Sequence, residues 1–285
     1  MATKRIFGIL GAGLAAAVLA AGGMAGVADA APFGDAPGQV EQDGNKVKKR
    51  EILRDSSSYQ YLSAPQRLEP GAKYHVARNG KLTSSCSLGW TVRQKSDPNR
   101  LFNLTAGHCG NKGDDVYLDP KGAGNPSDMV KIGRFAWSKY DGDSKITTGD
   151  DYALIELLPE MKQYLTGTPN MTLFDQKQSV VLQGWQSAEW LAQAKPYMCR
   201  LGYRSGITCG QFQDLEHGTN VSFDGITDQG DSGGVIWAFD PADTGRTKIY
   251  AVAVTSWVNF GQDAATSNGK TIDRAMKGLD LQILR

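Results

Sequence analysis

The sequence predicts an all-β protein built from two groups of antiparallel strands. Three observations lead to this prediction. Short apolar runs recur between turn signals, segments with helical periodicity are few, and the chain contains 34 glycines, which suit frequent tight turns. Of the 285 residues, those that follow an N-terminal signal segment are enough for one large all-β domain or two small ones.

The strands are predicted from these apolar runs. The first group lies at 87–93, 101–105, 116–118, 130–137 and 152–158. After a looser stretch at 159–178, the second group consists of a cysteine hairpin and the runs at 179–185, 221–226, 235–239 and 249–257. Near the C-terminus Ile272, Ala275, Met276 and Leu279 lie at helical spacing, so we expect a short helix over about 271–284.

Residues 1–30 have the features of a secretory signal peptide. Lys4 and Arg5 precede an apolar run at 6–27, and Ala28 and Ala30 supply the small residues of a cleavage site. An uncleaved membrane anchor is the alternative, because the run is long enough to span a bilayer. The many alanines and glycines of the run lower its hydrophobicity, and the cleavage pattern argues against an anchor. We therefore expect a secreted, extracellular protein without stable membrane association, and we expect it to be a monomer.

Residues 31–73 are expected to be a propeptide or an N-terminal extension that stays attached. Their composition shifts to polar residues, with a basic run at 46–50 and a serine tract at 56–58. We expect this segment to pack poorly, because it has few apolar clusters, and we place the folded domain at 74–285.

The formal net charge of the whole chain is +1, which offers no electrostatic reason to expect nucleic acid or an anionic membrane as a partner.

Two glycine-flanked motifs supply a nucleophile and a base. Ser232 lies in GDSGG at 230–234, and His108 lies in TAGHC at 105–109. A serine hydroxyl needs a neutral imidazole to take its proton and a third group to orient that imidazole. Asp151 is the candidate third group, because it directly precedes an apolar strand, and the N–H groups of Gly230 and Ser232 are candidates for an oxyanion hole.

Two rival arrangements fit less well. The pattern GxSxG at 230–234 also occurs in the nucleophile elbow of α/β-hydrolases, but no histidine follows Ser232. The subtilisin order would require Asp97, which lies in a polar, turn-like stretch. Asp150 is the nearest competitor of Asp151 for the role of the acid.

In this order, TAGHC, DYALI and GDSGG resemble the motifs of chymotrypsin-like serine proteases. CSLGW at 86–90 and CRLG at 199–202 resemble the secreted bacterial branch, which includes the streptogrisins and the α-lytic-type proteases. The resemblance runs from about Tyr74 to the C-terminus. It implies two antiparallel Greek-key β-barrels, at about 74–160 and 179–270, with His108, Asp151 and Ser232 in the cleft between them. It also implies a secreted serine endopeptidase that acts on protein or peptide substrates and needs no cofactor.

The resemblance also suggests structural roles for the cysteines and for Arg200. Four cysteines allow three pairings, of which proximity and the resemblance favour Cys86 with Cys109 and Cys199 with Cys209. We expect no metal site, because there is no CxxC pair and neither His75 nor His217 has ligand-like spacing to the cysteines. In the bacterial branch an arginine just after the first hairpin cysteine holds the aspartate before the nucleophile, which predicts an ion pair of Arg200 with Asp231.

The specificity pocket is predicted from the same resemblance. Ile226, six residues before the nucleophile, would form its floor, and Ser256, Trp257 and Val258 would form the wall strand that pairs with substrate. An apolar floor disfavours lysine and arginine, so we expect small or medium apolar residues at P1. Two aspartates, Asp224 and Asp228, could instead bring negative charge to the pocket. Two other functions stay open: a catalytically inactive binding or adhesion protein of the same fold, and an enzyme that acts mainly on esters.

Overall fold

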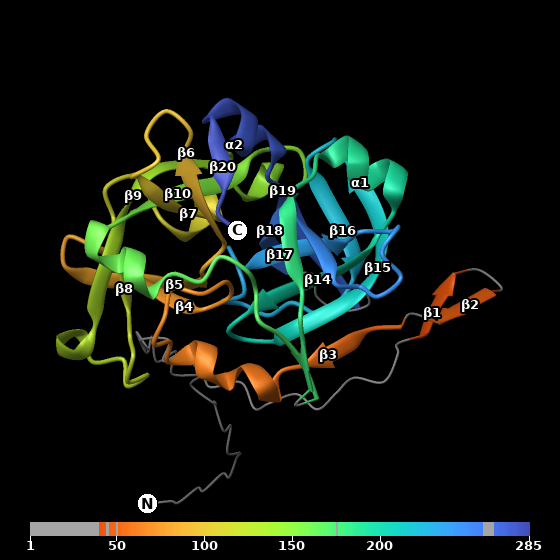
Figure 1. The fold of residues 1–285 in the computed structure, drawn as a ribbon, viewed down its shortest axis with the longest axis horizontal. Helices are drawn as coiled ribbons and strands as arrows, with labels where there is room; N and C mark the ends of the chain where they lie inside the picture. Colours follow the sequence, from red (N-terminus) through yellow and green to blue (C-terminus); the bar gives the residue numbers. More distant parts are fainter. Residues whose placement is uncertain (1–39, 44–45, 50, 175, 259–264) are drawn as a thin grey trace, which may run out of the picture. The chain divides into compact units, whose positions relative to one another are not determined.

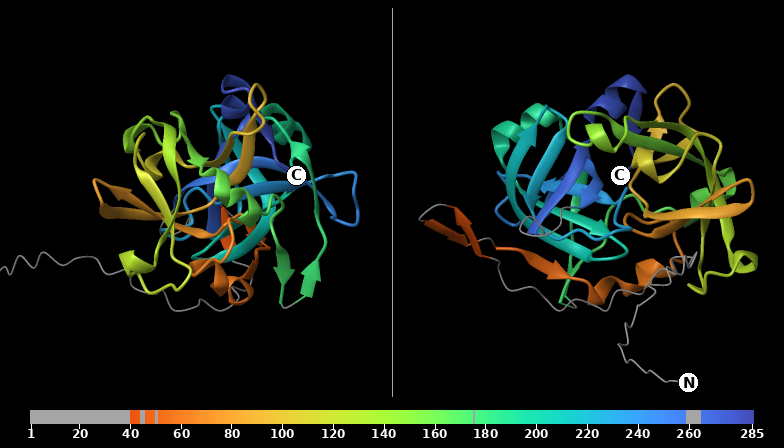
Figure 2. Two further views of the ribbon diagram at one scale, coloured as in Figure 1. Left: turned by 60° about the vertical axis from the view of Figure 1, so that its left-hand side comes forward. Right: turned by 180° about the vertical axis from the view of Figure 1, so that it is seen from behind.

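The computed structural model describes residues 40–43, 46–49, 51–174, 176–258 and 265–285. The predicted signal peptide lies outside these residues. The prediction of an all-β fold is confirmed, because the described chain is dominated by two large β-sheets with only short helices. Figures 1 and 2 show the two sheets as neighbouring curved units, with β4 to β10 in one and β14 to β19 in the other.

The first sheet has eight antiparallel strands in the order β20-β6-β7-β10-β9-β8-β4-β5. Its strands are β4 (Lys73–Arg78), β5 (Lys81–Ser87), β6 (Trp90–Gln94), β7 (Leu101–Thr105), β8 (Asp115–Leu118), β9 (Val130–Tyr140), β10 (Asp151–Leu157) and β20 (Leu281–Ile283). The C-terminal strand β20 joins this sheet by pairing with β6, so the end of the chain ties back to its first half.

The second sheet closes on itself, because β18 pairs with β17 on one side and with β19 on the other. Its strands are β13 (Val181–Trp185), β14 (Tyr197–Gly202), β15 (Gly206–Glu216), β16 (Asn220–Asp224), β17 (Val235–Phe239), β18 (Lys248–Val258) and β19 (Thr266–Thr271). The pairing of β13 with β18 is parallel, and β3 (Leu53–Asp55) adds an eighth strand beside β15.

The remaining elements are small. Two separate hairpins are formed by β1 (Val40–Asp43) with β2 (Lys46–Lys49) and by β11 (Met171–Leu173) with β12 (Gln176–Gln178). The helices are η1 (Ser57–Ser63), η2 (Gly107–Cys109), η3 (Pro126–Asp128), η4 (Asp143–Lys145), η5 (Pro159–Tyr164), α1 (Ala188–Ala194) and α2 (Asp273–Gly278). Among the residues that the structure describes, no helix has the length and apolar character needed to cross a bilayer.

The C-terminal helix is shorter than the predicted 271–284. Helix α2 ends at Gly278, Asp280 takes a positive φ of 49°, and the chain continues as β20. In this last segment Leu281 and Ile283 are buried while Gln282 is exposed, which is the two-residue period of a strand. The glycine and the turn outweigh the helical spacing of the apolar residues.

The expectation of a poorly packed segment before residue 74 is wrong for its described part from Glu51 onward. Tyr59 and Leu62 are almost completely buried, and β3 is hydrogen-bonded to β15. The Tyr59 hydroxyl donates to the carbonyl of Asn170 at 2.9 Å and accepts from the N–H of Thr172 at 2.7 Å. Isolated aromatic and aliphatic residues thus find partners far along the chain, which composition alone did not reveal.

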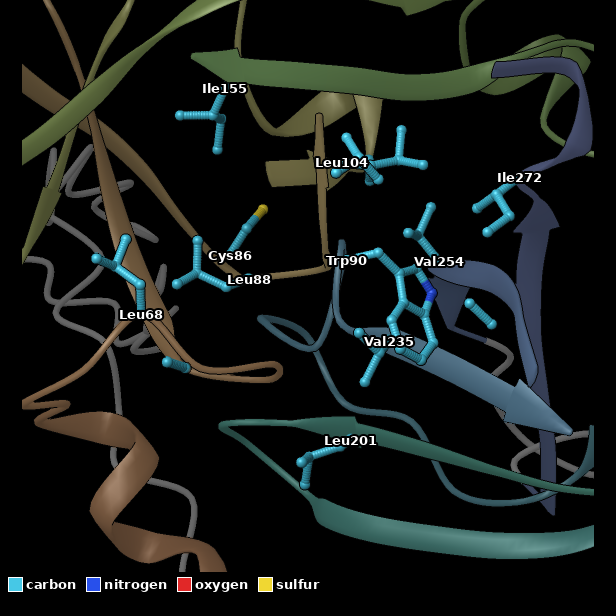
Figure 3. Close-up of a cluster of buried hydrophobic side chains, with 14 of the residues drawn as sticks. Leu68, Cys86, Leu88, Trp90, Leu104, Ile155, Leu201, Val235, Val254 and Ile272 are labelled. Atoms are coloured by element: carbon cyan, nitrogen blue, oxygen red, sulfur yellow. The ribbon is translucent and has the colours of Figure 1, made fainter. Parts of the chain in front are cut away.

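The main core joins residues of both sheets. In Figure 3 the indole of Trp90 lies beside Val235 and Val254, and its N–H donates to the carbonyl of Ala253 at 2.9 Å. Both predicted disulfides, Cys86–Cys109 and Cys199–Cys209, are present. The first ties the end of β5 to η2, and the second links the paired strands β14 and β15.

Candidate active site

His108 and Asp151 meet through two hydrogen bonds. The backbone N–H of His108 donates to Oδ1 of Asp151 at 2.8 Å, and the ring Nδ1 lies 2.9 Å from Oδ2. Asp151 opens β10 and is 1% exposed, whereas His108 is carried by η2, directly after β7. Because β7 and β10 are paired neighbours, the ends of these two strands bring the candidate base and the candidate acid together.

The local backbone around His108 depends on glycine. A Cβ atom at Gly107 would lie only 2.1 Å from the carbonyl oxygen of Lys139 in β9. The Ser138 hydroxyl donates to the Gly107 carbonyl at 2.9 Å, and the Ser84 hydroxyl donates to the carbonyl of Cys109 at 2.8 Å. Together with the disulfide, these contacts define the position of the imidazole before any substrate is present.

The neighbouring carboxylate of Asp150 has different partners. It forms ion pairs with Lys139 and with Arg274, the latter at 3.2 Å. Among the described contacts, only Asp151 of these two acids is hydrogen-bonded to His108. The hydrogen bonds therefore favour Asp151 over Asp150 as the candidate acid that orients His108.

Ser256 also contacts Asp151, although the sequence predicts this serine in the specificity pocket. The Ser256 hydroxyl donates to Oδ2 of Asp151. Burial alone would raise the pKa of Asp151, but the hydrogen bonds and charge of His108 and the Ser256 hydroxyl lower it. Burial conversely opposes the charged imidazole, yet Asp151 outweighs it and raises the pKa of His108, with a further contribution from the charge of Asp143.

Ser232 lies in a sharp loop that connects β16 to β17 of the second sheet and contacts the first sheet. Gly230 and Gly233 have positive φ angles of 103° and 82°, a region that favours glycine. A Cβ atom at Gly233 would lie 2.0 Å from Oγ1 of Thr105 on the first sheet. The Ser232 carbonyl accepts from the N–H of Ser87 at 2.8 Å, and the Gly230 carbonyl accepts from the Ser87 hydroxyl at 2.9 Å. The loop that carries Ser232 is thus anchored to the first sheet, close to the segment that carries His108.

His108 and Ser232 line the same open cavity, which has a volume of about 340 Å³. Its other lining residues are Tyr140, Asp143, Ile146, Gln229, Gly230, Ser256 and Trp257. In the described part of the chain, the N–H groups of Gly230 and Ser232 donate to no protein acceptor. Two backbone donors beside a hydroxyl and an imidazole are a set of groups suited to acyl transfer.

Tyr140, Asp143 and Ile146 were missed by the sequence analysis. The Tyr140 ring meets the His108 ring edge-on at 5.7 Å between centroids, and its hydroxyl donates to Asp143. These residues end β9 or lie in the connection from β9 to β10, where no motif marked them.

Arg200 and Asp231 form a completely buried ion pair, with 3.0 Å between Nη2 and Oδ2. The other oxygen of Asp231 accepts from the N–H groups of Arg204 and Ser205, at 3.0 and 3.1 Å. Arg200 also donates from Nε to the carbonyl of Ile226 at 2.7 Å. One guanidinium thus binds both ends of the segment that leads to Ser232.

The residues expected in the specificity pocket have mixed placements. Trp257 lines the cavity, whereas the side chain of Val258 lies outside the described residues. Asp224 is buried, and Oδ2 of Asp228 lies 3.6 Å from Nη2 of Arg54, on the N-terminal strand β3. The charge of Asp228 therefore has a partner within the protein.

Potential metal-ligating atoms come close together at Cys86, His108 and Cys109. The two sulfur atoms form a disulfide, so they offer no thiolate to an ion. The imidazole alone remains, and its Nδ1 is engaged by Asp151.

The comparisons with known proteins concern the fold. No family model matches this sequence, and no curated protein does either. Among solved structures, Protease A of Thermobifida fusca is similar with a TM-score of 0.52 and 23% identity, over 76% of this chain and 98% of that protein. A Nocardiopsis protease is similar with a TM-score of 0.51 and 19% identity, over 76% and 99% of the two chains. The protein thus has the fold of the bacterial chymotrypsin-like serine proteases.

Proposed function

We propose that this protein is a secreted serine endopeptidase that cleaves peptide bonds through an acyl-enzyme on Ser232. The observation that carries this proposal is that His108, which is hydrogen-bonded to buried Asp151, lines the same cavity as Ser232. The two disulfides support an extracellular setting, because disulfides persist in oxidising compartments.

In the proposed reaction, His108 takes the proton of the Ser232 hydroxyl as the oxygen attacks the carbonyl carbon of the substrate. The N–H groups of Gly230 and Ser232 stabilise the tetrahedral oxyanion. The charged imidazole then gives its proton to the leaving amine, while Asp151 stays ionised and stabilises it. Water, activated by His108, releases the acid product and frees Ser232.

The proposed substrate preference rests on Ile226 and Asp228, which the sequence predicts at the specificity pocket and which are not among the residues that line the cavity described above. The carbonyl of Ile226 is bound by Arg200 and Thr208, and the Asp228 carboxylate is paired with Arg54. A lysine or arginine side chain would lose its hydration and would have to compete with Arg54 for the Asp228 carboxylate. We therefore propose small or medium apolar residues at P1, as the apolar floor at Ile226 suggests.

A fluorophosphonate probe tests the proposal, because it reacts only with an activated serine. The purified protein should be labelled on Ser232, and both Ser232→Ala and His108→Ala should abolish the labelling. His217→Ala is the matched control, since His217 is exposed in a turn, and it should leave the labelling rate unchanged.

Each alternative function gives a different result. Absence of labelling in the wild-type protein would contradict an enzyme and favour an inactive binding protein. Labelling with turnover of ester substrates but no cleavage of unfolded proteins would favour an esterase. Labelling that survives His108→Ala at the wild-type rate would remove His108 from the mechanism.

A further inference from the structure

The N-terminal strand β3 is part of the second barrel. It pairs antiparallel with β15, with Leu53 opposite Cys209 and Asp55 opposite Ile207. Asp55 is completely buried and accepts hydrogen bonds from the N–H of Ser58 at 3.1 Å and from the N–H of Phe174 at 2.6 Å. These hydrogen bonds hold the strand at its end as well as along its edge.

Gly206 in the second sheet leaves room for the backbone of the N-terminal segment at the end of β3. Gly206 begins β15 with a φ of 66°, and a Cβ atom there would lie 2.3 Å from the carbonyl oxygen of Asp55 and 2.6 Å from the Cα of Ser56. A larger residue at this position would collide with the backbone of the N-terminal segment. The protease fold and the segment before residue 74 therefore fit each other at backbone level.

Arg54 is the side chain that β3 directs toward the nucleophile loop. In the sheet register Arg54 lies opposite Thr208, and Thr208 lies opposite Arg200, so the three form one row across β3, β15 and β14. The Thr208 hydroxyl donates to the carbonyl of Ile226 at 3.1 Å, as Arg200 does at 2.7 Å. The row thus lies against the segment 226–231.

The row contributes two positive charges that meet two carboxylates. Nη2 of Arg54 is 3.6 Å from Oδ2 of Asp228, and Arg54 is 5% exposed. Arg200 is paired with Asp231, whose Oδ2 also accepts from the N–H of Asp228 at 2.7 Å. Burial and the charge of Asp231 raise the pKa of Asp228, while Arg200, Arg54 and Arg204 oppose that rise. Two carboxylates of the loop that carries Ser232 thus lie among three arginines, of which Arg54 and Arg200 form ion pairs with them.

We propose that Arg54 is a positioning residue of the loop 228–232, and that the segment carrying it belongs to the working enzyme. This inference rests on the proposed hydrolase function of Ser232. Without Arg54, the carboxylate of Asp228 loses its ion-pair partner and faces Asp231, with only the guanidinium of Arg200 and the more weakly contributing Arg204 to oppose the repulsion. The repulsion displaces the loop, and the N–H groups of Gly230 and Ser232 then no longer converge on the oxyanion.

The test compares Arg54→Met with Arg67→Met, an exposed arginine of the same N-terminal segment. Rates are expressed per active site, titrated with the fluorophosphonate probe. For Arg54→Met we expect kcat on a peptide substrate to fall 10- to 100-fold with KM changed less than threefold, and Arg67→Met to match the wild type. Arg54→Lys should retain part of the activity, because lysine keeps the positive charge but lacks the planar guanidinium group.

A second substitution separates positioning from mere stability. Asp228→Asn in the Arg54→Met background removes the unbalanced carboxylate and should restore kcat to within about fivefold of the wild type. A purely structural role predicts a lower melting temperature, normal kcat per titrated site and no rescue. Normal kcat in Arg54→Met, or an active enzyme whose N-terminus by mass spectrometry lies beyond Arg54, would overturn the inference.

Failure of the proposed function gives a different pattern, in which the wild-type protein reacts with no probe. The interaction of Arg54 with Asp228 is then tested only by its effect on the melting temperature. Arg54→Met should lower it and Asp228→Asn should restore it in a Ser232→Ala background. Equal melting temperatures of the Ser232→Ala protein with and without Arg54→Met would then overturn the role of Arg54.

Discussion

Asp151 holds His108 at two points, one on the backbone and one on the ring. Oδ1 accepts from the His108 N–H at 2.8 Å, and Oδ2 lies 2.9 Å from Nδ1. The first contact fixes the position of the residue, and the second fixes the tautomer whose other nitrogen is free to accept a proton. One carboxylate thus sets both the position and the tautomer of the proposed base.

Replacing Asp151 with asparagine should lower kcat by about 10⁴-fold, the loss that this change causes in a Ser-His-Asp triad. The asparagine amide donates a hydrogen bond and so favours the wrong imidazole tautomer. Asp150→Asn is the matched control, because Asp150 pairs with Lys139 and Arg274 instead. Steady-state kinetics on one peptide substrate measure both variants, and equal losses would show that the acid is misassigned.

Activity should fall as the pH drops through the pKa of His108, because only the neutral imidazole accepts the Ser232 proton. Asp151 raises this pKa above its ordinary value of 6.5, so the midpoint of the acid limb in kcat/KM should lie above pH 6.5. The raised pKa also means that this group stabilises the fold below pH 6.5, and that the stabilisation is lost as the pH rises through the folded-state pKa. Melting temperatures of the Ser232→Ala protein across this range test the second statement. A flat kcat/KM profile down to pH 4 would contradict a histidine base.

Ser256→Ala should reduce kcat/KM by roughly 10- to 100-fold, since hydrogen bonds to charged groups are worth about 1.5–3 kcal/mol. The change removes a donor from a carboxylate that is 1% exposed. The carboxylate becomes more basic, so the acid limb of the pH profile should move to higher pH. Ser222→Ala on β16 serves as the control, and no change in either quantity for Ser256→Ala would show that the hydroxyl is dispensable.

Cleavage in a peptide library should occur mainly after small or medium apolar residues, at least tenfold over lysine and arginine. The reason is the ion pair of Asp228 with Arg54, because a substrate lysine or arginine would have to compete with Arg54 for this carboxylate. Val258→Gly should increase kcat/KM for phenylalanine and tyrosine by about 10- to 100-fold, because it removes methyl groups from the wall strand. A profile dominated by arginine or lysine would point to Asp228 or Asp224 as a pocket charge.

The sequence by itself determined the elements whose signal is local. The runs at 101–105 and 235–239 are strands with the predicted ends, because apolar and β-branched residues bounded by turns leave few alternatives. The order of His108, Asp151 and Ser232, and the glycines around them, were likewise readable from short motifs. The candidate site was therefore largely predictable in composition.

Only the tertiary structure decided how distant segments share charges and hydrogen bonds. The Ser256 hydroxyl reaches Asp151 across 105 positions, and Arg54 reaches Asp228 through a strand pairing that polar composition had hidden. Such contacts leave no local periodicity, because they depend on which barrel edges meet and which loops close over them. The same holds for residues 271–284, where a turn at Asp280 and pairing with β6 convert the end of an apparent helix into a strand. Local patterns fix which face of a segment is apolar, and long-range packing fixes what that face and its polar neighbours touch.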